Sequence, residues 1–134
     1  YHIESRMNGR TKSYGFVWNA PQGLVLLRDH KPCACIGFKI ENDSVIVHQI
    51  QGARKGKEFF VPFAWTTVLL DAVVYTAYTL GYRRAEVVPA ALNRWSKFRS
   101  EEAYRRFLRL YDETAQGLGF TRAPNQENFR LLLR

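Results

Sequence analysis

The first third of the chain consists of short apolar runs separated by polar turns. Each run is rich in β-branched or other large apolar side chains, which is typical of strands. The turns between the runs contain proline, glycine or aspartate, and connections this short join antiparallel neighbours. We therefore predict an antiparallel meander of three or four strands, at residues 15–19, 24–28, 33–40 and 44–51.

Beyond residue 64 the spacing of the apolar residues changes from about two to about 3.6. This spacing predicts a helix from Ala64 to Leu80, and Gly81 tolerates the positive φ of a helix end. A second helix is expected from Glu101 to about Gln116, with Ser100 as its N-cap. Two shorter apolar runs predict further strands, at residues 85–88 and 128–133.

The predicted element order is β-β-β-β-α-β-α-β. The first helix and the strand at 85–88 complete a β-α-β unit, and such units are parallel crossovers. We expect an α/β (α+β) fold with a mixed, mostly antiparallel central sheet and helices on its faces. With 134 residues, of which 46% are hydrophobic, the chain predicts one globular domain spanning residues 1–134.

No apolar run reaches the roughly 20 residues that cross a bilayer, and the N-terminus lacks the order of a signal peptide. The chain starts without Met, which leaves an upstream segment open. Cys33 and Cys35 are the only cysteines, and in a strand they point to one face. Two small apolar core residues are favoured there over a disulfide or a metal site. We expect a cytoplasmic protein without a bound metal.

The formal net charge of +8 predicts attraction to polyanions such as nucleic acid, a phosphate-bearing cofactor or an acidic protein. One basic cluster follows residue 93 and has aromatic side chains within it. Its composition is compatible with nucleic-acid binding through phosphate contacts and stacking, although such a cluster is more often a solvated helix face. The cluster comprises Arg94, Lys97, Arg99, Arg105, Arg106 and Arg109, with Trp95 and Phe98 interleaved.

A second basic segment, residues 52–57 with the sequence GARKGK, follows the strand predicted at 44–51. Backbone amides near a helix N-terminus carry partial positive charge, and glycine lets a ligand approach the backbone closely. The segment therefore has two interpretations that stay open: a phosphate-binding loop and a solvated surface turn.

Three features together resemble the GNAT-type N-acetyltransferase superfamily, over about residues 24–133. The first is a strand followed by a basic, glycine-containing loop and a helix. The second is a strand that ends near an asparagine, in VVPAALN at 87–93, and the third is a helix that ends in LGF at 118–120. The N-terminal helices of that superfamily are not evident in this sequence.

This resemblance implies an acyl-CoA-dependent N-acyltransferase that moves an acetyl group from acetyl-CoA to an amine. In such enzymes the loop wraps the pyrophosphate, and the pantetheine arm pairs with open strand backbone where two strands diverge. We expect this divergence after Gln51. The implied cofactor-binding residues are Ile50, Gln51, Gly52, Arg54, Lys55, Gly56, Lys57 and Asn93.

The catalytic candidates are His48 and Tyr111. His48 lies in the strand beside the expected thioester, and the unperturbed pKa of histidine is near neutrality, so it is the candidate base, although a structural role stays open. The family's acid tyrosine stands four residues before the Gly of Gly-Phe, where this chain has Ala115. Tyr111, one turn earlier, is either its substitute or a core residue. These departures keep an alternative open: a catalytically inactive GNAT-like scaffold that binds partners, nucleic acid included.

Overall fold

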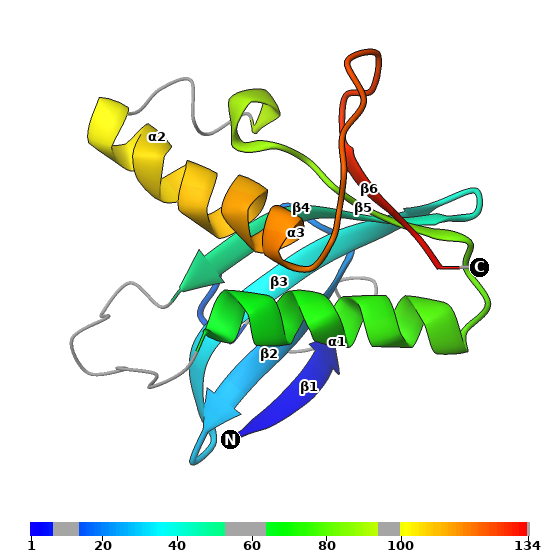
Figure 1. Cartoon of the computed structure of the whole chain (residues 1–134). Coiled ribbons are helices and arrows are strands. Elements are labelled where there is room, and N and C mark those ends of the chain that lie inside the picture. Colours follow the sequence, from blue (N-terminus) through cyan, green and yellow to red (C-terminus); the bar gives the residue numbers. More distant parts are fainter. Residues whose placement is uncertain (7–13, 53–63, 94–99, 134) are drawn as a thin grey trace.

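The computed structural model describes residues 1–6, 14–52, 64–93 and 100–133. Its strands form one sheet in the order β1-β2-β3-β4-β5-β6 (Figure 1). Neighbouring strands are antiparallel except β4 and β5, which run parallel. The predicted fold class, a mixed and mostly antiparallel sheet with one crossover, is confirmed. The strands are β1 (His2–Arg6), β2 (Gln22–Arg28), β3 (Lys31–Glu41), β4 (Ser44–Gly52), β5 (Arg84–Val87) and β6 (Phe129–Leu132).

Both predicted helices form. Gly81 follows the first one with a φ of +90°, and the side chain of Ser100 caps the second by accepting a 3.3 Å hydrogen bond from the Ala103 N–H. The described helices include none that is long and apolar enough to cross a membrane. The helices are α1 (Trp65–Thr79), the 3-10 turn η1 (Ala90–Leu92), α2 (Glu101–Phe107), the π-helical stretch η3 (Leu108–Glu113) and α3 (Thr114–Gly117).

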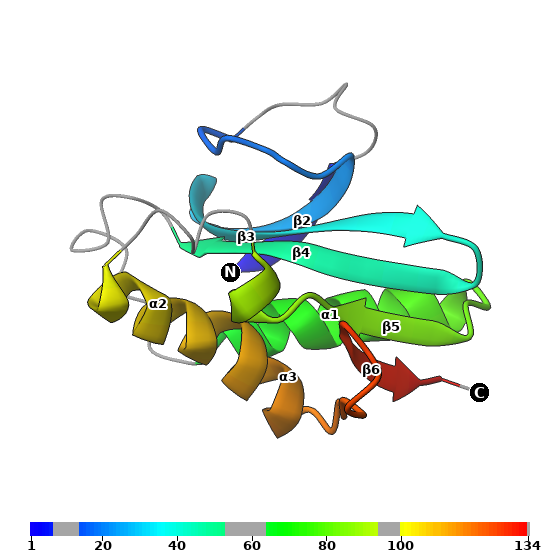
Figure 2. The ribbon, with the colours of Figure 1, turned by 90° about the horizontal axis from the view of Figure 1, so that it is seen from above.

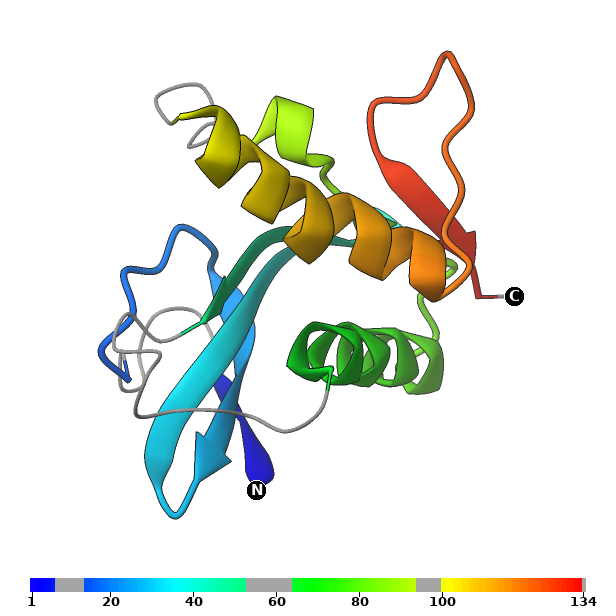
Figure 3. The same ribbon diagram turned by 60° about the vertical axis from the view of Figure 1, so that its left-hand side comes forward.

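The helices cover one face of the sheet, and the segment before β2 covers part of the other (Figure 2). Helix α1 and the continuous helix from α2 to α3 lie side by side on the first face (Figure 3). Leu69, Val73 and Ala115 are buried there against strand residues such as Val47 and Ile50. We call this face of the sheet the helix face and the opposite one the second face.

The strand predicted at 15–19 is wrong, because this segment lies across the second face without entering the sheet. Phe16 is buried there with Val25, and the Trp18 ring packs so closely on Gly23 that a Cβ at that glycine would overlap it. The Arg6 guanidinium lies over the same ring, 4.5 Å from its centroid. The aromatic residues of the segment therefore serve packing, and β1 is the strand that pairs with β2 instead.

The prediction that Cys33 and Cys35 share one face is also wrong. The pairing of β2 with β3 steps from Ala34 to Pro32, which leaves Cys33 as an extra residue in β3. Because an extra residue shifts the alternation of a strand, Cys33 joins the core of the helix face while Cys35 lies with Val25 on the second face. Both thiols are free and buried.

Candidate functional site

The candidate site is the place where β4 and β5 separate. The two strands pair from Ser44 to Val47, and the Val88 N–H adds a last 2.9 Å hydrogen bond to the Val47 carbonyl. Strand β4 then continues to Gly52, whereas the chain after β5 turns into η1. The strands thus diverge after Val47, which corrects the expected divergence after Gln51.

A β-bulge at His48 marks the point of divergence. Strand β4 pairs with β3 through Val47 and then through Gln49, so His48 has no opposite residue in the register. A bulge bends its strand and shifts the alternation of side chains beyond it. As a result Ile50 lies on the helix face like Val47, and Gln49 lies toward the segment that covers the second face.

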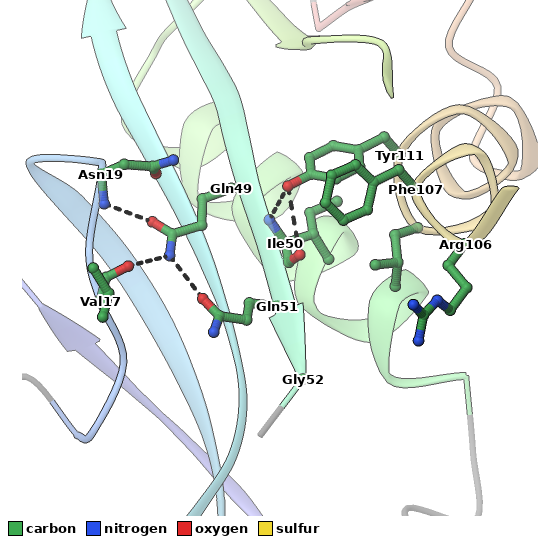
Figure 4. Close-up of a pocket in the computed structure, with 10 residues that line it drawn as sticks. Val17, Asn19, Gln49, Ile50, Gln51, Gly52, Arg106, Phe107 and Tyr111 are labelled. Atoms are coloured by element: carbon green, nitrogen blue, oxygen red, sulfur yellow. Dashed lines mark hydrogen bonds between the residues drawn. The ribbon is translucent and has the colours of Figure 1, made fainter. Parts of the chain in front are cut away.

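A cavity of about 390 Å³ opens beside this part of β4 (Figure 4). Its walls come from three elements that are distant in the sequence. One wall is the segment before β2, another is the end of β4, and the third is the helix that starts at α2. The lining residues are Val17, Asn19, Gln49, Ile50, Gln51, Gly52, Arg106, Phe107, Leu110 and Tyr111.

The Tyr111 hydroxyl bridges the gap between the helix and the open edge of β4. It accepts a 2.9 Å hydrogen bond from the Ile50 N–H and lies 3.5 Å from the Ile50 carbonyl oxygen (Figure 4). The Asn93 side chain bonds the same hydroxyl. Tyr111 and Asn93 are each only 4% exposed, so this network is shielded from solvent. One phenol thereby joins β4, the chain after β5 and the helix.

Burial raises the pKa of the Tyr111 hydroxyl, and the hydrogen bonds from Ile50 and Asn93 act in the opposite direction. Because an ordinary tyrosine already titrates near pH 10, the Tyr111 phenol keeps its proton at neutral pH. It is therefore both a donor and an acceptor in the cavity wall.

The π-helical stretch η3 determines where Tyr111 points. Such stretches insert an extra residue into a helix and recur at functional sites. The turn is held by the Thr114 hydroxyl, which donates to the Arg109 carbonyl at 3.0 Å. Next to Tyr111, the Asp112 carboxylate accepts a 2.8 Å hydrogen bond from the Ala90 N–H, which fixes η1 against the helix. Tyr111 bonds β4 and Asp112 bonds the chain after β5, so two adjacent residues of the helix fix both sides of the split.

Gln49 holds the opposite wall. Its side chain donates 3.0 Å to the Val17 carbonyl and 3.1 Å to Gln51 Oε1, and its Oε1 accepts 3.0 Å from the Asn19 N–H (Figure 4). The residue is only 5% exposed, and all of these polar groups are paired. The segment before β2 is therefore attached to β4 directly beside the cavity.

The structure brings together part of the predicted site. Ile50, Gln51, Gly52 and Tyr111 line the cavity, and Asn93 reaches it through Tyr111. His48 is half-buried and is not among the lining residues. Ala115 is fully buried in the core. The predicted phosphate-binding residues Arg54, Lys55, Gly56 and Lys57 lie outside the described residues.

The sequence did not predict Gln49 and Phe107 as site residues, and it indicated Arg106 only as part of the basic cluster. A glutamine two residues before the end of an apolar strand is a signal for Gln49, because a buried amide needs specific partners. Phe107 packs edge-on against Tyr111 with ring centroids 5.9 Å apart, one helical turn away. In the part of the chain that the structure describes, no three His, Cys, Asp or Glu side chains gather as potential metal ligands.

The sequence matches no family model and no curated protein. Solved structures, however, share the fold. The GNAT-family N-acetyltransferase YhbS from Escherichia coli, in complex with CoA, aligns over 86% of this chain and 60% of its own, with 16% identity and a TM-score of 0.50. A chain of the AtaT–AtaR complex bound to DNA aligns over 99% of this chain and 95% of its own, with 12% identity and a TM-score of 0.57.

A third similar structure is N-acetylglutamate synthase from Neisseria gonorrhoeae, complexed with coenzyme A and N-acetylglutamate. It aligns over all of this chain, 100%, and over 36% of its own length, with 11% identity and a TM-score of 0.51. The fold is therefore that of the GNAT-type N-acetyltransferases, as the sequence predicts. The chain spans 60% of the length of the E. coli protein.

Proposed function

We propose that this protein is an acyl-CoA-dependent N-acyltransferase whose acyl donor occupies the cavity beside β4. The observation that carries the proposal is the hydrogen bond between the Tyr111 hydroxyl and the Ile50 N–H, at the open edge of a split sheet. The similarity to GNAT-fold structures solved with CoA supports the same assignment. Acetyl-CoA is the proposed co-substrate, and an amine is the proposed acceptor.

The chemistry needs three contributions. The amine nitrogen attacks the thioester carbonyl carbon, the C–S bond breaks, and one proton leaves the amine while one reaches the thiolate. A backbone N–H that faces the site stabilises the negative charge on the carbonyl oxygen. Ile50 offers this donor, since its N–H faces the open edge of β4 and bonds the Tyr111 hydroxyl.

Tyr111 is the proposed acid. Its phenol keeps a proton at neutral pH because burial raises its pKa, and it lies within hydrogen-bond reach of the same backbone donor. When an acyl oxygen takes the Ile50 N–H, the Tyr111 hydroxyl is released to donate toward the departing sulfur. Asn93 keeps the phenol oriented meanwhile.

The proposed base is His48. Since it does not line the cavity, it is proposed to take the proton of the amine through a water molecule. His48 precedes Gln49 in the chain, at the bulge where the open part of β4 starts. Arg54, Lys55, Gly56 and Lys57 are proposed to contact the pyrophosphate, as the sequence suggests. Ile50, Gln51 and Gly52 supply strand backbone to the pantetheine arm.

Calorimetric titration with acetyl-CoA and with desulfo-CoA tests the donor site. We expect both to bind, because neither contact with the phosphates nor pairing with β4 needs the sulfur. If neither ligand gives a heat of binding at millimolar concentration, the enzyme proposal is wrong. Mass spectrometry of the acceptor after incubation with labelled acetyl-CoA then separates transfer from binding alone.

A second candidate function is a GNAT-fold module that binds nucleic acid without catalysis. Arg105, Arg106 and Arg109 are all exposed on the helix that forms one cavity wall. One structure with a similar fold belongs to a complex bound to DNA. Binding of this kind weakens steeply as salt rises, with a slope that follows the number of phosphate contacts. A salt-independent affinity for RNA and DNA speaks against it.

A further inference from the structure

A second cavity, of about 610 Å³, lies on the second face of the sheet at the paired ends of β4 and β5. Its floor is formed by side chains that alternate with the core residues of β4, β5 and β6, among them Ser44, Glu86 and Arg130. The tip of the β3–β4 hairpin and the segment 125–128 before β6 form its sides. That segment, orange to red in Figure 3, stands at the edge of the sheet.

Glu86 is a buried carboxylate in the floor of this cavity. The residue is only 6% exposed, so its charge requires compensation. Its Oε1 accepts a 3.2 Å hydrogen bond from Asn128 Nδ2 and lies 3.6 Å from Arg130 Nε. Arg130 therefore balances Glu86.

Lys39 pairs with Glu41, so Arg84 is the lining cation without an ion pair among the described residues. The exposed Glu127 also lines the cavity. Its Nε donates a 3.0 Å hydrogen bond to Ser44 Oγ, which directs the guanidinium along the cavity floor. Among the described residues, no carboxylate forms an ion pair with Arg84. A guanidinium fork of this kind recognises carboxylates through paired hydrogen bonds. The cavity therefore has a free anion-binding group at the end far from the split.

The other end of this cavity is lined by residues that follow β5 toward the split. Val88 and Leu92 line it there, and the next residue, Asn93, bonds Tyr111 in the first cavity. Arg84 lies opposite Ser44, whereas the Tyr111 hydroxyl meets β4 at Ile50. When the bulged residue His48 is left out, the stretch of β4 from Ser44 to Ile50 is about 16 Å long at the usual rise of a strand.

We propose that this cavity binds the acceptor, and that the acceptor is the N-terminal end of a peptide with an acidic residue about four or five positions from its amine. A free α-amino acid cannot place its carboxylate at Arg84 and its amine at Ile50, because both groups are attached to one carbon. An extended chain covers the distance from Arg84 to the split with its amine at Ile50. This inference rests on the proposed acyl transfer and adds the chemical class of its acceptor.

Binding of octapeptides with a free N-terminus and a fluorophore at the C-terminus tests the proposal by anisotropy. The set carries a single Glu at position 5, a single Glu at position 2, or Gln at position 5, in an otherwise neutral sequence. We expect the first peptide to bind about tenfold more tightly than the other two, because a charge-assisted hydrogen bond is lost in each of them. Equal affinity for the three overturns the proposal.

Variants identify the residue responsible. Arg84→Gln is expected to remove the preference for Glu at position 5, and Arg84→Lys to keep part of it, since the charge remains without the fork. Arg105→Gln, which removes an exposed cation that does not line this cavity, serves as the control. A preference that survives in folded Arg84→Gln, or that disappears equally in Arg105→Gln, contradicts the assignment.

A separate titration with acetyl-CoA on the same samples keeps the two proposals apart. Loss of acetyl-CoA binding with retained peptide selectivity overturns the acyl transfer and, with it, the acceptor role of the peptide. Acetyl-CoA binding without any selectivity among the peptides overturns the further inference alone.

Discussion

The Tyr111 hydroxyl and the Ile50 N–H form a buried 2.9 Å hydrogen bond across 61 residues of sequence. It satisfies a backbone donor that the departure of β5 leaves without a strand partner. An unpaired buried N–H costs about 1–3 kcal/mol, so this contact stabilises the open sheet edge as well as positioning the phenol. The same bond must yield when another acceptor takes the Ile50 amide.

Tyr111→Phe tests both roles. We expect unfolding in urea to become easier by about 1–3 kcal/mol, because the Ile50 N–H loses its acceptor. If Tyr111 is the acid, the substitution also removes most acyl transfer while acetyl-CoA still binds in calorimetry. Tyr104→Phe, on the same helix, is the matched control and should leave stability and transfer unchanged. Full transfer activity in Tyr111→Phe contradicts the acid role.

The raised pKa of Tyr111 predicts a specific alkaline effect. The folded protein holds this proton more tightly than the unfolded chain, so its contribution is complete below about pH 10. It is lost as the pH rises through the higher pKa of the folded state. The gap in stability between wild type and Tyr111→Phe should therefore narrow above about pH 10 in urea titrations. Burial raises the pKa of Cys35 to about 12, but this thiol is present in both proteins, so its own effect on stability cancels in the comparison.

Gln49→Leu should separate the segment before β2 from β4. It leaves the Val17 carbonyl and the Asn19 N–H without their partner, at a cost of about 1–3 kcal/mol. We expect hydrogen exchange at Asn19 to accelerate relative to the core strands. Gln116→Leu, at an exposed position of α3, controls for the change in side-chain chemistry. Unchanged exchange at Asn19 in Gln49→Leu shows that packing alone holds the segment.

Two glycine substitutions are predicted to have opposite effects. A Cβ at Gly37 lies 2.7 Å from the Ala20 Cβ and 3.0 Å from Gln49 Oε1, so Gly37→Ala should destabilise by about 1–3 kcal/mol. Gly117 ends α3 with no neighbouring atom within 4 Å of an added Cβ. Gly117→Ala is expected to be neutral or stabilising by up to about 1 kcal/mol. Thermal unfolding of the two variants provides the comparison.

The double substitution Lys55→Glu/Lys57→Glu tests the phosphate role of the basic loop. Reversal of two cations that contact a pyrophosphate should weaken CoA binding by at least about tenfold, and more at low salt. Arg83→Glu/Arg122→Glu reverses the same charge at two exposed positions that do not line the first cavity. A similar loss in both double variants attributes the effect to net charge, whereas no loss in the first rejects the loop as the phosphate site.

Much of the fold follows from the periodicity of the sequence. The apolar runs and the capping signals at Gly81 and Ser100 predicted three strands of the meander, both helices and the parallel crossover. One error in the strand assignment arises because apolar content does not distinguish a strand from a segment that packs across a sheet. For that reason residues 15–19 were assigned to the sheet, while the mostly exposed β1 went unrecognised.

The candidate site was only partly predictable, because its geometry depends on irregularities. The bulges at Cys33 and His48 arise from pairing between strands, and a periodic pattern carries no signal for them. The π-helical stretch that aims Tyr111 at Ile50 likewise depends on contacts of Thr114 with its own turn. The residue types at Ile50, Tyr111 and Asn93 suggested a site, whereas their hydrogen bonds required the structure.

The unpaired residue His48 reverses the alternation of side chains between the two halves of β4. Upstream of it, odd-numbered side chains such as Val47 enter the core; downstream, the even-numbered Ile50 does. If His48 paired in regular alternation instead, Gln49 would enter the apolar interior and Ile50 would leave it. A homologue that lacks the extra residue should therefore keep Gln49 and Ile50 on their present faces but lose the bend of β4 at the split.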